Sequence, residues 1–165
     1  MACSNAIAVF DQRGLKGTIR FHQCRGQRET FVDIDLHDMQ PNRTRAIHIH
    51  DLGDTSGGCK TLGPHWNPDN KQHGSIWVNI HDSHAGDMIN NFTSDKRGKF
   101  RYSYVDPRIQ IRGDITESII GRSVVIHDGE DDLGLGGNAE SKITGNAGGR
   151  FGCAVIGHAK DGQIN

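Results

Sequence analysis

Two histidines separated by one residue, His48 and His50, are the first side chains in the sequence whose types and spacing could do chemistry. They alternate with isoleucines ahead of a glycine turn, so residues 46–50 are predicted to form a β-strand. Successive side chains on a strand point to opposite faces, which puts both imidazoles on one face and Ile47 and Ile49 on the other. Paired imidazoles suit copper and zinc. An isolated pair of this kind is more often an ordinary polar strand face, so the choice depends on the rest of the chain.

Two long polar segments rich in glycine, residues 52–86 and 128–149, do not fit as strands. Each begins just after a strand that carries histidine. Loops longer than about 12–15 residues without secondary structure of their own are usually functional or disordered. We therefore expect these two segments to be ordered loops that carry site residues.

Several short motifs with histidine or aspartate occur in and beside these loops. The first loop contains Gly-Pro-His-Trp-Asn-Pro, His-Gly and His-Ala-Gly-Asp, which supply His65, His73, His84 and Asp87. Further along come Val-Val-Ile-His with His127, Asp-Asp-Leu-Gly beginning at Asp131, and a glycine-rich run at 145–153 with Arg150 and Cys153. The whole set, in this order, resembles the copper-zinc superoxide dismutase family over residues 47–157.

The resemblance implies a copper site and a zinc site that share one histidine. The copper ligands would be His48, His50, His65 and His127, and the zinc ligands would be His65, His73, His84 and Asp87. His65 would bridge the two ions through both ring nitrogens, which an imidazole can do only after it loses its second proton. Three imidazole nitrogens and one carboxylate oxygen form an ordinary tetrahedral zinc set. His81 is the one competitor of His84, and the family spacing His-x-Gly-Asp favours His84.

Three further residues take roles from the same resemblance. Asp131 matches an aspartate that accepts hydrogen bonds from the non-ligating nitrogens of His48 and His73, and such partners orient metal ligands. Arg150 matches the arginine beside the copper that docks the anionic substrate, and Thr144 matches a threonine of the channel wall. Without the resemblance, Asp131 would be interpreted as a solvated loop carboxylate and Arg150 as a surface cation.

The four cysteines, Cys3, Cys24, Cys59 and Cys153, include no Cys-x-x-Cys pair. In a reducing cytosol the default expectation is four reduced thiols. The resemblance sets this default aside for Cys59 and Cys153, which match the disulfide of the family. Cys3 and Cys24 have no counterpart in the family pattern, and we expect them to stay outside any disulfide.

The elements that must position these residues are strands. Segments rich in β-formers recur at short spacing, separated by Gly, Asn and Asp. We expect strands at residues 6–11, 15–23, 29–36, 45–50, 87–93, 99–105, 115–119 or slightly later, 123–127 and 153–158. The pattern predicts an all-β sandwich or barrel. The resemblance implies an eight-stranded Greek-key β-barrel, or flattened sandwich, with two long functional loops and a single domain over residues 1–165.

Composition narrows the class of protein. A chain of 165 residues can bury a sizeable core in one domain. A net charge of −1 and a pI of about 6.8 give no case for binding nucleic acid or a membrane surface. No apolar run approaches the roughly 18 residues of a membrane helix, and the opening residues do not resemble a secretory signal. We expect a cytoplasmic protein.

The activity implied by the resemblance is the disproportionation of superoxide to dioxygen and hydrogen peroxide. One copper ion per subunit would change oxidation state, linked through His65 to one zinc ion, with Arg150 and His65 as the catalytic residues. The main alternative hypothesis is a copper storage or delivery module with the same fold. The third hypothesis is a purely structural sandwich with incidental metal affinity. Storage relatives typically lack a copper ligand or the arginine. Both are present here, which favours the enzyme.

The resemblance also implies partners and a difference in surface charge. Family members pair through segments that correspond to residues 52–54, 120–121 and 155–157, so we expect a homodimer, with a copper chaperone as a further candidate partner.

Eukaryotic relatives usually carry lysines in the second long loop that draw in superoxide. Gly129 and Ile143 occupy those approximate places here, and Lys142 is the nearby cation. We therefore expect weaker long-range attraction of the substrate.

Overall fold

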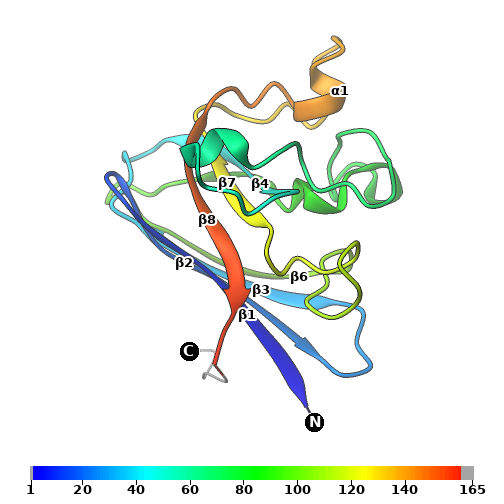
Figure 1. Ribbon diagram of the computed structural model, residues 1–165. Coiled ribbons are helices and arrows are strands. Elements are labelled where there is room, and N and C mark those ends of the chain that lie inside the picture. The colour runs from blue at the N-terminus through cyan, green and yellow to red at the C-terminus, as the bar shows by residue number, and fades with distance from the viewer. Residues whose placement is uncertain (1, 161–165) are drawn as a thin grey trace.

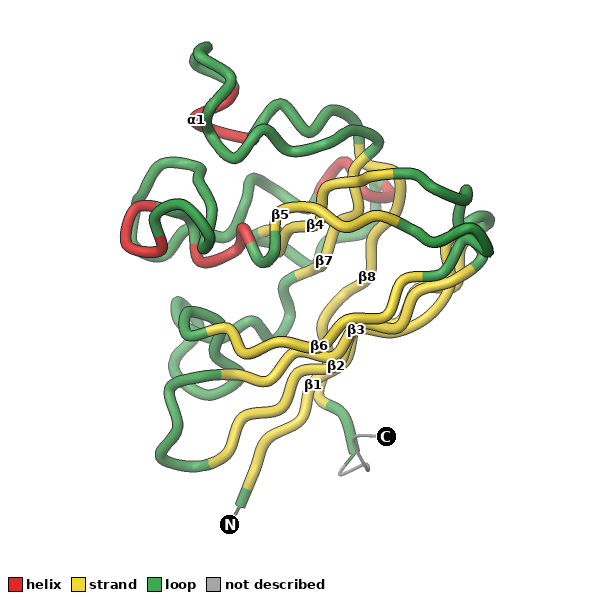
Figure 2. Tube along the Cα trace, turned by 180° about the vertical axis from the view of Figure 1, so that it is seen from behind, coloured by secondary structure: helices red, strands yellow, loops and turns green. Residues whose placement is uncertain are grey.

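The computed structural model describes residues 2–160, which form one sheet of eight antiparallel strands rolled into a nearly closed barrel (Figure 1). The strands are β1 (Cys3–Gln12), β2 (Leu15–Cys24), β3 (Thr30–His37), β4 (Thr44–His50), β5 (Asn90–Thr93), β6 (Phe100–Asp106), β7 (Ser123–His127) and β8 (Arg150–His158). Their order is β5-β4-β7-β8-β1-β2-β3-β6. The predicted all-β Greek-key architecture is therefore confirmed. In Figure 2, β8 connects a layer of β1, β2, β3 and β6 to a layer of β4, β5 and β7.

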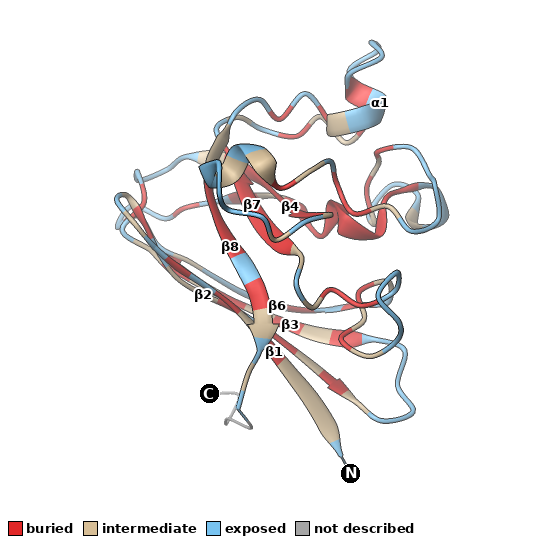
Figure 3. Ribbon diagram, viewed as in Figure 1, coloured by how far each residue is buried: buried red, intermediate tan, exposed pale blue. Residues whose placement is uncertain are grey.

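The two layers bury their residues in different ways. In β3 burial alternates strictly, with Val32, Ile34 and Leu36 facing the core and the residues between them half-buried. In β7 every residue is buried, and in β4 every residue after Thr44 is buried (Figure 3). A strand is buried on both faces only when something covers its outer face. Here the outer face of β4 and β7 carries the histidines, and loops cover it.

The covering loops are the two long segments expected from the sequence. The first, between β4 and β5, contains three short 3-10 helices, η1 (Gly58–Thr61), η2 (Ile80–Asp82) and η3 (Ala85–Asp87). The second, between β7 and β8, contains the one-turn helix α1 (Ser141–Thr144). Figures 1 and 2 show both loops on the side of the molecule away from the N-terminal end of β1. None of the helices in residues 2–160 has the length and apolar character needed to span a bilayer.

Eight of the nine expected strands are present, with ends that differ by a few residues, and the expected strand at 115–119 is wrong. That segment forms turns instead. Asp114 Oδ1 accepts hydrogen bonds from the backbone N–H and the hydroxyl of Thr116, at 2.8 and 2.6 Å. The backbone N–H of Ser118 turns back to the carbonyl oxygen of Asp114, at 2.9 Å. Aspartate side chains that bond to the backbone two residues on are typical turn formers, and here they outweigh β-propensity.

The expectation for Cys3 and Cys24 is also wrong, because the two residues form a disulfide. β1 begins at Cys3 rather than at the expected residue 6, and β2 continues to Cys24. The register makes the two cysteines direct cross-strand partners, with their Cα atoms 3.9 Å apart. The longer strands thus bring together two thiols that the sequence pattern left separate.

Candidate metal centre

Strand β4 presents His48 and His50 on its outer face, as predicted, and two neighbouring segments add histidines beside them. The first long loop runs antiparallel to the end of β4, where His50 pairs with His65 in an isolated bridge and Trp66 N–H donates to Ile49 O at 2.8 Å. The His65 ring centroid therefore lies 4.1 Å from that of His48. His127 ends β7, the strand next to β4, with its ring centroid 4.8 Å from that of His48.

The ligand atoms of these four histidines converge, and they lie within 4.8 Å of one another. His50 Nδ1 donates to Gly63 O at 2.8 Å and His127 Nδ1 donates to Gly148 O at 3.3 Å. In a neutral imidazole only one nitrogen carries a proton, so the two Nε2 atoms, 3.3 Å apart, face each other as lone pairs. His48 Nδ1 and His65 Nε2 are buried without a hydrogen-bond partner among the described residues.

Buried nitrogens that lack partners are unfavourable unless something satisfies them. A group of four lone pairs aimed at one point, with no donor among them, is suited to a cation. Imidazole nitrogens are good ligands for copper. The four atoms therefore fit a copper ion, and the fit rests on the orphaned nitrogens rather than on residue identity alone. We call the four histidines the copper group.

A second group lies on the other side of His65 and is centred on Asp87. Its carboxylate atom Oδ1 lies 3.1 Å from His65 Nδ1, 3.0 Å from His73 Nδ1 and 3.0 Å from His84 Nδ1. The other oxygen, Oδ2, accepts hydrogen bonds from the backbone N–H groups of His84 and Gly74, at 2.9 and 3.1 Å. Asp87 is fully buried. Three imidazole nitrogens and a carboxylate oxygen match a tetrahedral zinc set.

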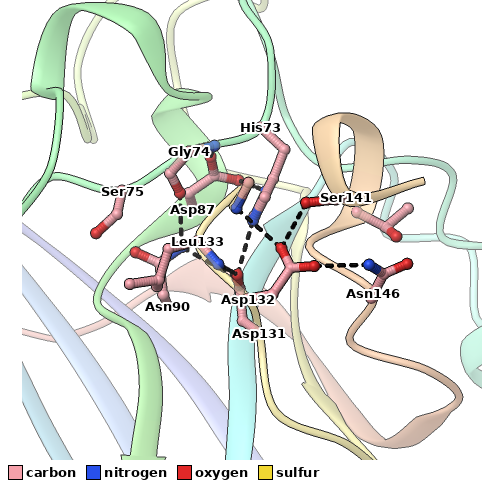
Figure 4. A network of polar contacts seen from close by, with 12 residues as sticks. His73, Gly74, Ser75, Asp87, Asn90, Asp131, Asp132, Leu133, Ser141 and Asn146 are labelled. Carbon is pink, nitrogen blue, oxygen red and sulfur yellow. Dashed lines mark hydrogen bonds and ion pairs between the residues drawn. The ribbon is translucent and has the colours of Figure 1, made fainter. Parts of the chain in front are cut away.

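Asp131 connects the two groups, and Figure 4 shows it beside His73 and Asn90. Its Oδ2 accepts from His48 Nε2 at 2.6 Å and its Oδ1 accepts from His73 Nε2 at 2.9 Å. A hydrogen bond at one ring nitrogen fixes the other for metal binding, so a single carboxylate orients one ligand of each group. Asp131 therefore lies beside His48 and His73, the two histidines with which the resemblance paired it.

Two asparagines and a glycine, none of them expected as site residues, surround this carboxylate. Asn90 is fully buried, and its Nδ2 donates to Asp131 Oδ2 at 3.0 Å. Asn91 exchanges two hydrogen bonds of 2.8 Å with the backbone of Asp131. Gly145 has a positive φ, and a Cβ there would lie 2.4 Å from both His73 Nε2 and Asp131 Oδ1. Asparagine is disfavoured in β-strands, so two asparagines in succession at the start of a predicted strand could have indicated a special role. The sequence offered no comparable signal for Gly145.

Burial and neighbouring charge set the protonation of the groups before metal binds. Desolvation and the nearby His65 ring lower the pKa values of His48 and His50, and they lower the pKa of His127 to about 4. His73 behaves in the opposite way: burial lowers its pKa, but hydrogen bonds to Asp131 and Asp87 outweigh burial and raise it to about 9. The copper group is therefore neutral at pH 7, whereas His73 carries a proton.

Arg150 begins β8 and lies at the edge of the copper group. Its guanidinium donates to Cys59 O at 2.6 Å and to Gly63 O at 2.5 Å. The pocket in front of it has a volume of about 310 Å³ and includes His50, His65, His127, Thr144 and Arg150 in its lining.

Cys59 and Cys153 form a disulfide across 94 residues, which ties the first long loop to β8. His81 is exposed in η2 and is not part of the Asp87 group.

The fold and the site together define a class: an antiparallel β-barrel whose outer face carries two adjacent metal-ligand groups that share one imidazole. Comparison with known proteins then identifies the family. The family model for copper/zinc superoxide dismutase matches residues 15–156. The chain belongs to the copper/zinc superoxide dismutase family.

Individual relatives agree with this assignment. A copper-zinc superoxide dismutase of Paramecium bursaria Chlorella virus 1 is 45% identical over 157 residues, which cover 95% of this chain and 80% of that protein. A copper-zinc superoxide dismutase of Kluyveromyces lactis is 42% identical over 93% of this chain and 96% of its own. Among solved structures, the clock protein EA4 is similar with a TM-score of 0.86 and 37% identity, over 96% of this chain and 97% of that one.

Proposed function

We propose that this chain is a superoxide dismutase, which converts two superoxide ions and two protons to dioxygen and hydrogen peroxide. His48, His50, His65 and His127 would hold copper, and His65, His73, His84 and Asp87 would hold zinc. One observation carries the proposal: His65 directs an orphaned Nε2 at the copper group and Nδ1 at the zinc group. Copper supplies the one-electron redox chemistry and zinc the fixed positive charge beside it.

His65 is the residue that holds and delivers a proton in this proposal. Its ring is buried, with Nε2 beside the copper group and Nδ1 beside Asp87. When Nε2 is not bound to copper it would carry a proton, and it would pass this proton to the peroxide formed from superoxide in the adjoining pocket; the second proton of hydrogen peroxide would come from solvent. The fixed ring position keeps the donor within reach of the anion, as general acid catalysis requires.

Arg150 binds and orients the anionic substrate in this proposal. Two carbonyl oxygens fix its guanidinium on the pocket wall, so the positive charge is in place before the anion arrives. Preorganised charge of this kind acts without a cost of rearrangement. Thr144 lines the same pocket, and its hydroxyl donates to Glu140 Oε1 at 2.8 Å, which supports a role in the channel wall.

A superoxide assay on protein loaded with copper and zinc tests the proposal, with His127→Ala as the paired variant. We expect dismutation by the loaded wild type and loss of activity together with copper in the variant. Loaded wild type without activity would favour the alternative of a copper storage or delivery module. That alternative is not favoured here, because all the copper ligands and Arg150 are present and converge.

Homodimer formation is a second part of the proposal. Residues 52–54, 120–121 and 155–157 lie together: a Cβ on Gly53 would lie 2.2 Å from Gly121 O and 3.2 Å from Val155 Cγ1, and Gly121 N–H donates to Ile156 O at 2.9 Å. Leu52 and Val155 are 47% and 40% exposed. A contiguous patch of small and apolar residues is suited to a two-fold contact. Sedimentation at micromolar concentration tests it, and a monomeric mass would contradict it.

Three expectations complete the proposal. We propose one domain for residues 1–165, supported by the continuous eight-stranded sheet, and limited proteolysis tests it. We propose a location in the cytoplasm, tested by cell fractionation. A copper chaperone is the candidate source of the metal, and copper content after expression with and without such a protein tests this point.

A further inference from the structure

The outer face of the β1–β2 hairpin carries a second cluster of metal-ligand side chains, Cys3, His22 and Cys24. Their ligand atoms lie within 4.8 Å of one another, and all three residues are half-buried. Figures 1 and 2 place the N-terminal end of β1 on the opposite side of the molecule from α1 and the long loops. The cluster is therefore separate from the dismutase centre.

The register of the hairpin builds this cluster. Cys3 is paired with Cys24, and Asn5 is paired with His22, so the four side chains follow one another on the same face. The alternate residues point inward, among them Ala6, Phe21 and Gln23, which are buried. Gln23 Oε1 accepts from the backbone N–H of Ile111 at 2.9 Å, which fixes the end of β2 to the segment between β6 and β7. The cluster thus stands on a firmly held pair of strands.

The imidazole of His22 is oriented as metal-bound imidazoles are. Its Nδ1 lies 2.6 Å from Asn5 Oδ1, a carbonyl oxygen that can only accept, so Nδ1 carries the proton. In the neutral ring Nε2 then presents its lone pair, and this atom lies 3.2 Å from Cys24 Sγ. A disulfide sulfur has no proton to donate. A disulfide that only staples the hairpin would not require an imidazole lone pair directed at the sulfur.

We propose that the reduced form of this cluster is a binding site for monovalent copper, formed by the two sulfurs of Cys3 and Cys24 and by Nε2 of His22. Thiolates favour Cu(I), zinc and iron–sulfur clusters, and structural zinc sites almost always take four protein ligands. Two soft thiolates and one imidazole, a set of three, therefore favour Cu(I). Asn5 is a positioning residue, because it sets the tautomer of His22 without touching the ion.

Reduction opens the site and oxidation closes it. A dithiol reductant gives two electrons and two protons to the Cys3–Cys24 bond, which breaks to two thiols, while the reductant forms its own disulfide. Binding of Cu(I) then releases the two thiol protons and forms two sulfur–copper bonds and one nitrogen–copper bond. Copper binding at this face thus depends on the thiol redox state of the surroundings.

A titration of the fully metallated protein tests the proposal. The protein is reduced with a dithiol, desalted without oxygen and titrated with Cu(I) held by a chromophoric chelator. We expect reduced wild type to take one Cu(I) per chain beyond the metals already bound, and oxidised wild type to take none. Reduced protein that takes no further copper, or that prefers zinc to Cu(I), would overturn the proposal.

Variants identify the ligands. Cys24→Ser should abolish the additional copper. His22→Gln and Asn5→Ala keep both cysteines and should each lower the affinity, for Asn5→Ala by about 10–100-fold. His37→Gln removes another half-buried histidine of the same barrel and should bind as wild type, as should a variant with both Cys59 and Cys153 replaced by serine. Unchanged binding in Cys24→Ser or His22→Gln, or loss of binding in the Cys59/Cys153 variant, would contradict the three-ligand site.

Discussion

Arg150 donates a hydrogen bond to the carbonyl oxygen of Cys59 at 2.6 Å, across 91 residues of sequence. Cys59 is in turn bonded to Cys153, three residues beyond Arg150 on the same strand. Arg150 and Cys153 both belong to β8. The disulfide therefore fixes Cys59 to the strand of Arg150, and the carbonyl group of Cys59 in turn holds the Arg150 guanidinium beside the copper group. This relationship connects the disulfide to the anion binding that we propose for Arg150.

Loss of the disulfide should lower both stability and activity. For Cys59→Ser we expect the free energy of unfolding to fall by about 2–5 kcal/mol, because the unfolded chain without the disulfide has more conformational freedom. Activity should fall as well at temperatures where the variant is folded, since the carbonyl that holds Arg150 loses its anchor. Denaturant unfolding and superoxide assays measure the two effects. Activity that equals wild type in folded variant would show that Arg150 is positioned without the disulfide.

Replacement of Arg150 should affect the rate and not the metal content. A hydrogen bond to a charged group is worth about 1.5–3 kcal/mol, so Arg150→Ala should lower the rate by about 10–100-fold. Arg150→Lys keeps the charge but lacks the fork that reaches Cys59 O and Gly63 O, and should recover part of the loss. Pulse radiolysis with metal analysis checks both. An unaltered rate in Arg150→Ala would exclude this residue as the anion-binding group.

Asp131→Asn should weaken both metal groups at once. The amide keeps the shape of the side chain but cannot accept from both His48 Nε2 and His73 Nε2. Loss of such partners typically lowers metal affinity about 10–100-fold. Asp132→Asn is the matched variant, because Asp132 bonds to Ser141 and Asn146 rather than to a metal-group histidine. Competition with chelators gives the affinities, and equal effects of the two variants would contradict the bridging role.

Zinc binding to the metal-free protein should release a proton. The pKa of His73 is raised to about 9, so at pH 7 its ring is protonated, and Nδ1 must lose the proton before it can bind zinc. Affinity for zinc should therefore increase with pH up to about 9 and be constant above it. Calorimetry in buffers of different ionisation enthalpy counts the protons, and binding without release at pH 7 would contradict this order of events.

A lysine at the pocket mouth should speed the reaction at low salt. Ile143 lines the pocket and is 56% exposed, so Ile143→Lys adds a positive charge there without disturbing the core. The gain should disappear as salt increases, because screening removes long-range attraction. Val105→Lys makes the same charge change on β6, at a residue that is also 56% exposed, and should have little effect. Equal gains in both variants would indicate an effect of net charge alone.

Gly129 is less suitable for the same experiment. A Cβ at Gly129 would lie 2.9 Å from the carbonyl oxygen of Ala147, the partner of the Gly129 N–H. A side chain there requires the backbone to shift. The absence of lysine at this place thus has a steric reason in this chain, whereas at Ile143 it does not.

The sequence by itself determined the fold class, and its resemblance to a known family supplied the candidate site residues. Period-two alternation, as in β3, follows from the need to bury one face, and eight of the nine strands expected from alternating or β-rich segments are present. The strand at 115–119 failed because the turn-forming bonds of Asp114 are local and outweigh an apolar pattern. The motif order indicated which histidines belong together through resemblance, without showing that their atoms meet.

Only the tertiary structure decided how the atoms face one another. That His48 Nδ1 and His65 Nε2 are orphaned, and that Asn90 and Gly145 frame Asp131, depends on packing between segments far apart in sequence. The bond between Cys3 and Cys24 likewise depends on strand register, which is set by pairing across the whole hairpin. A sequence pattern specifies which side chains of a strand face outward. Which outward-facing side chains of two strands lie opposite each other is decided only when the strands pair.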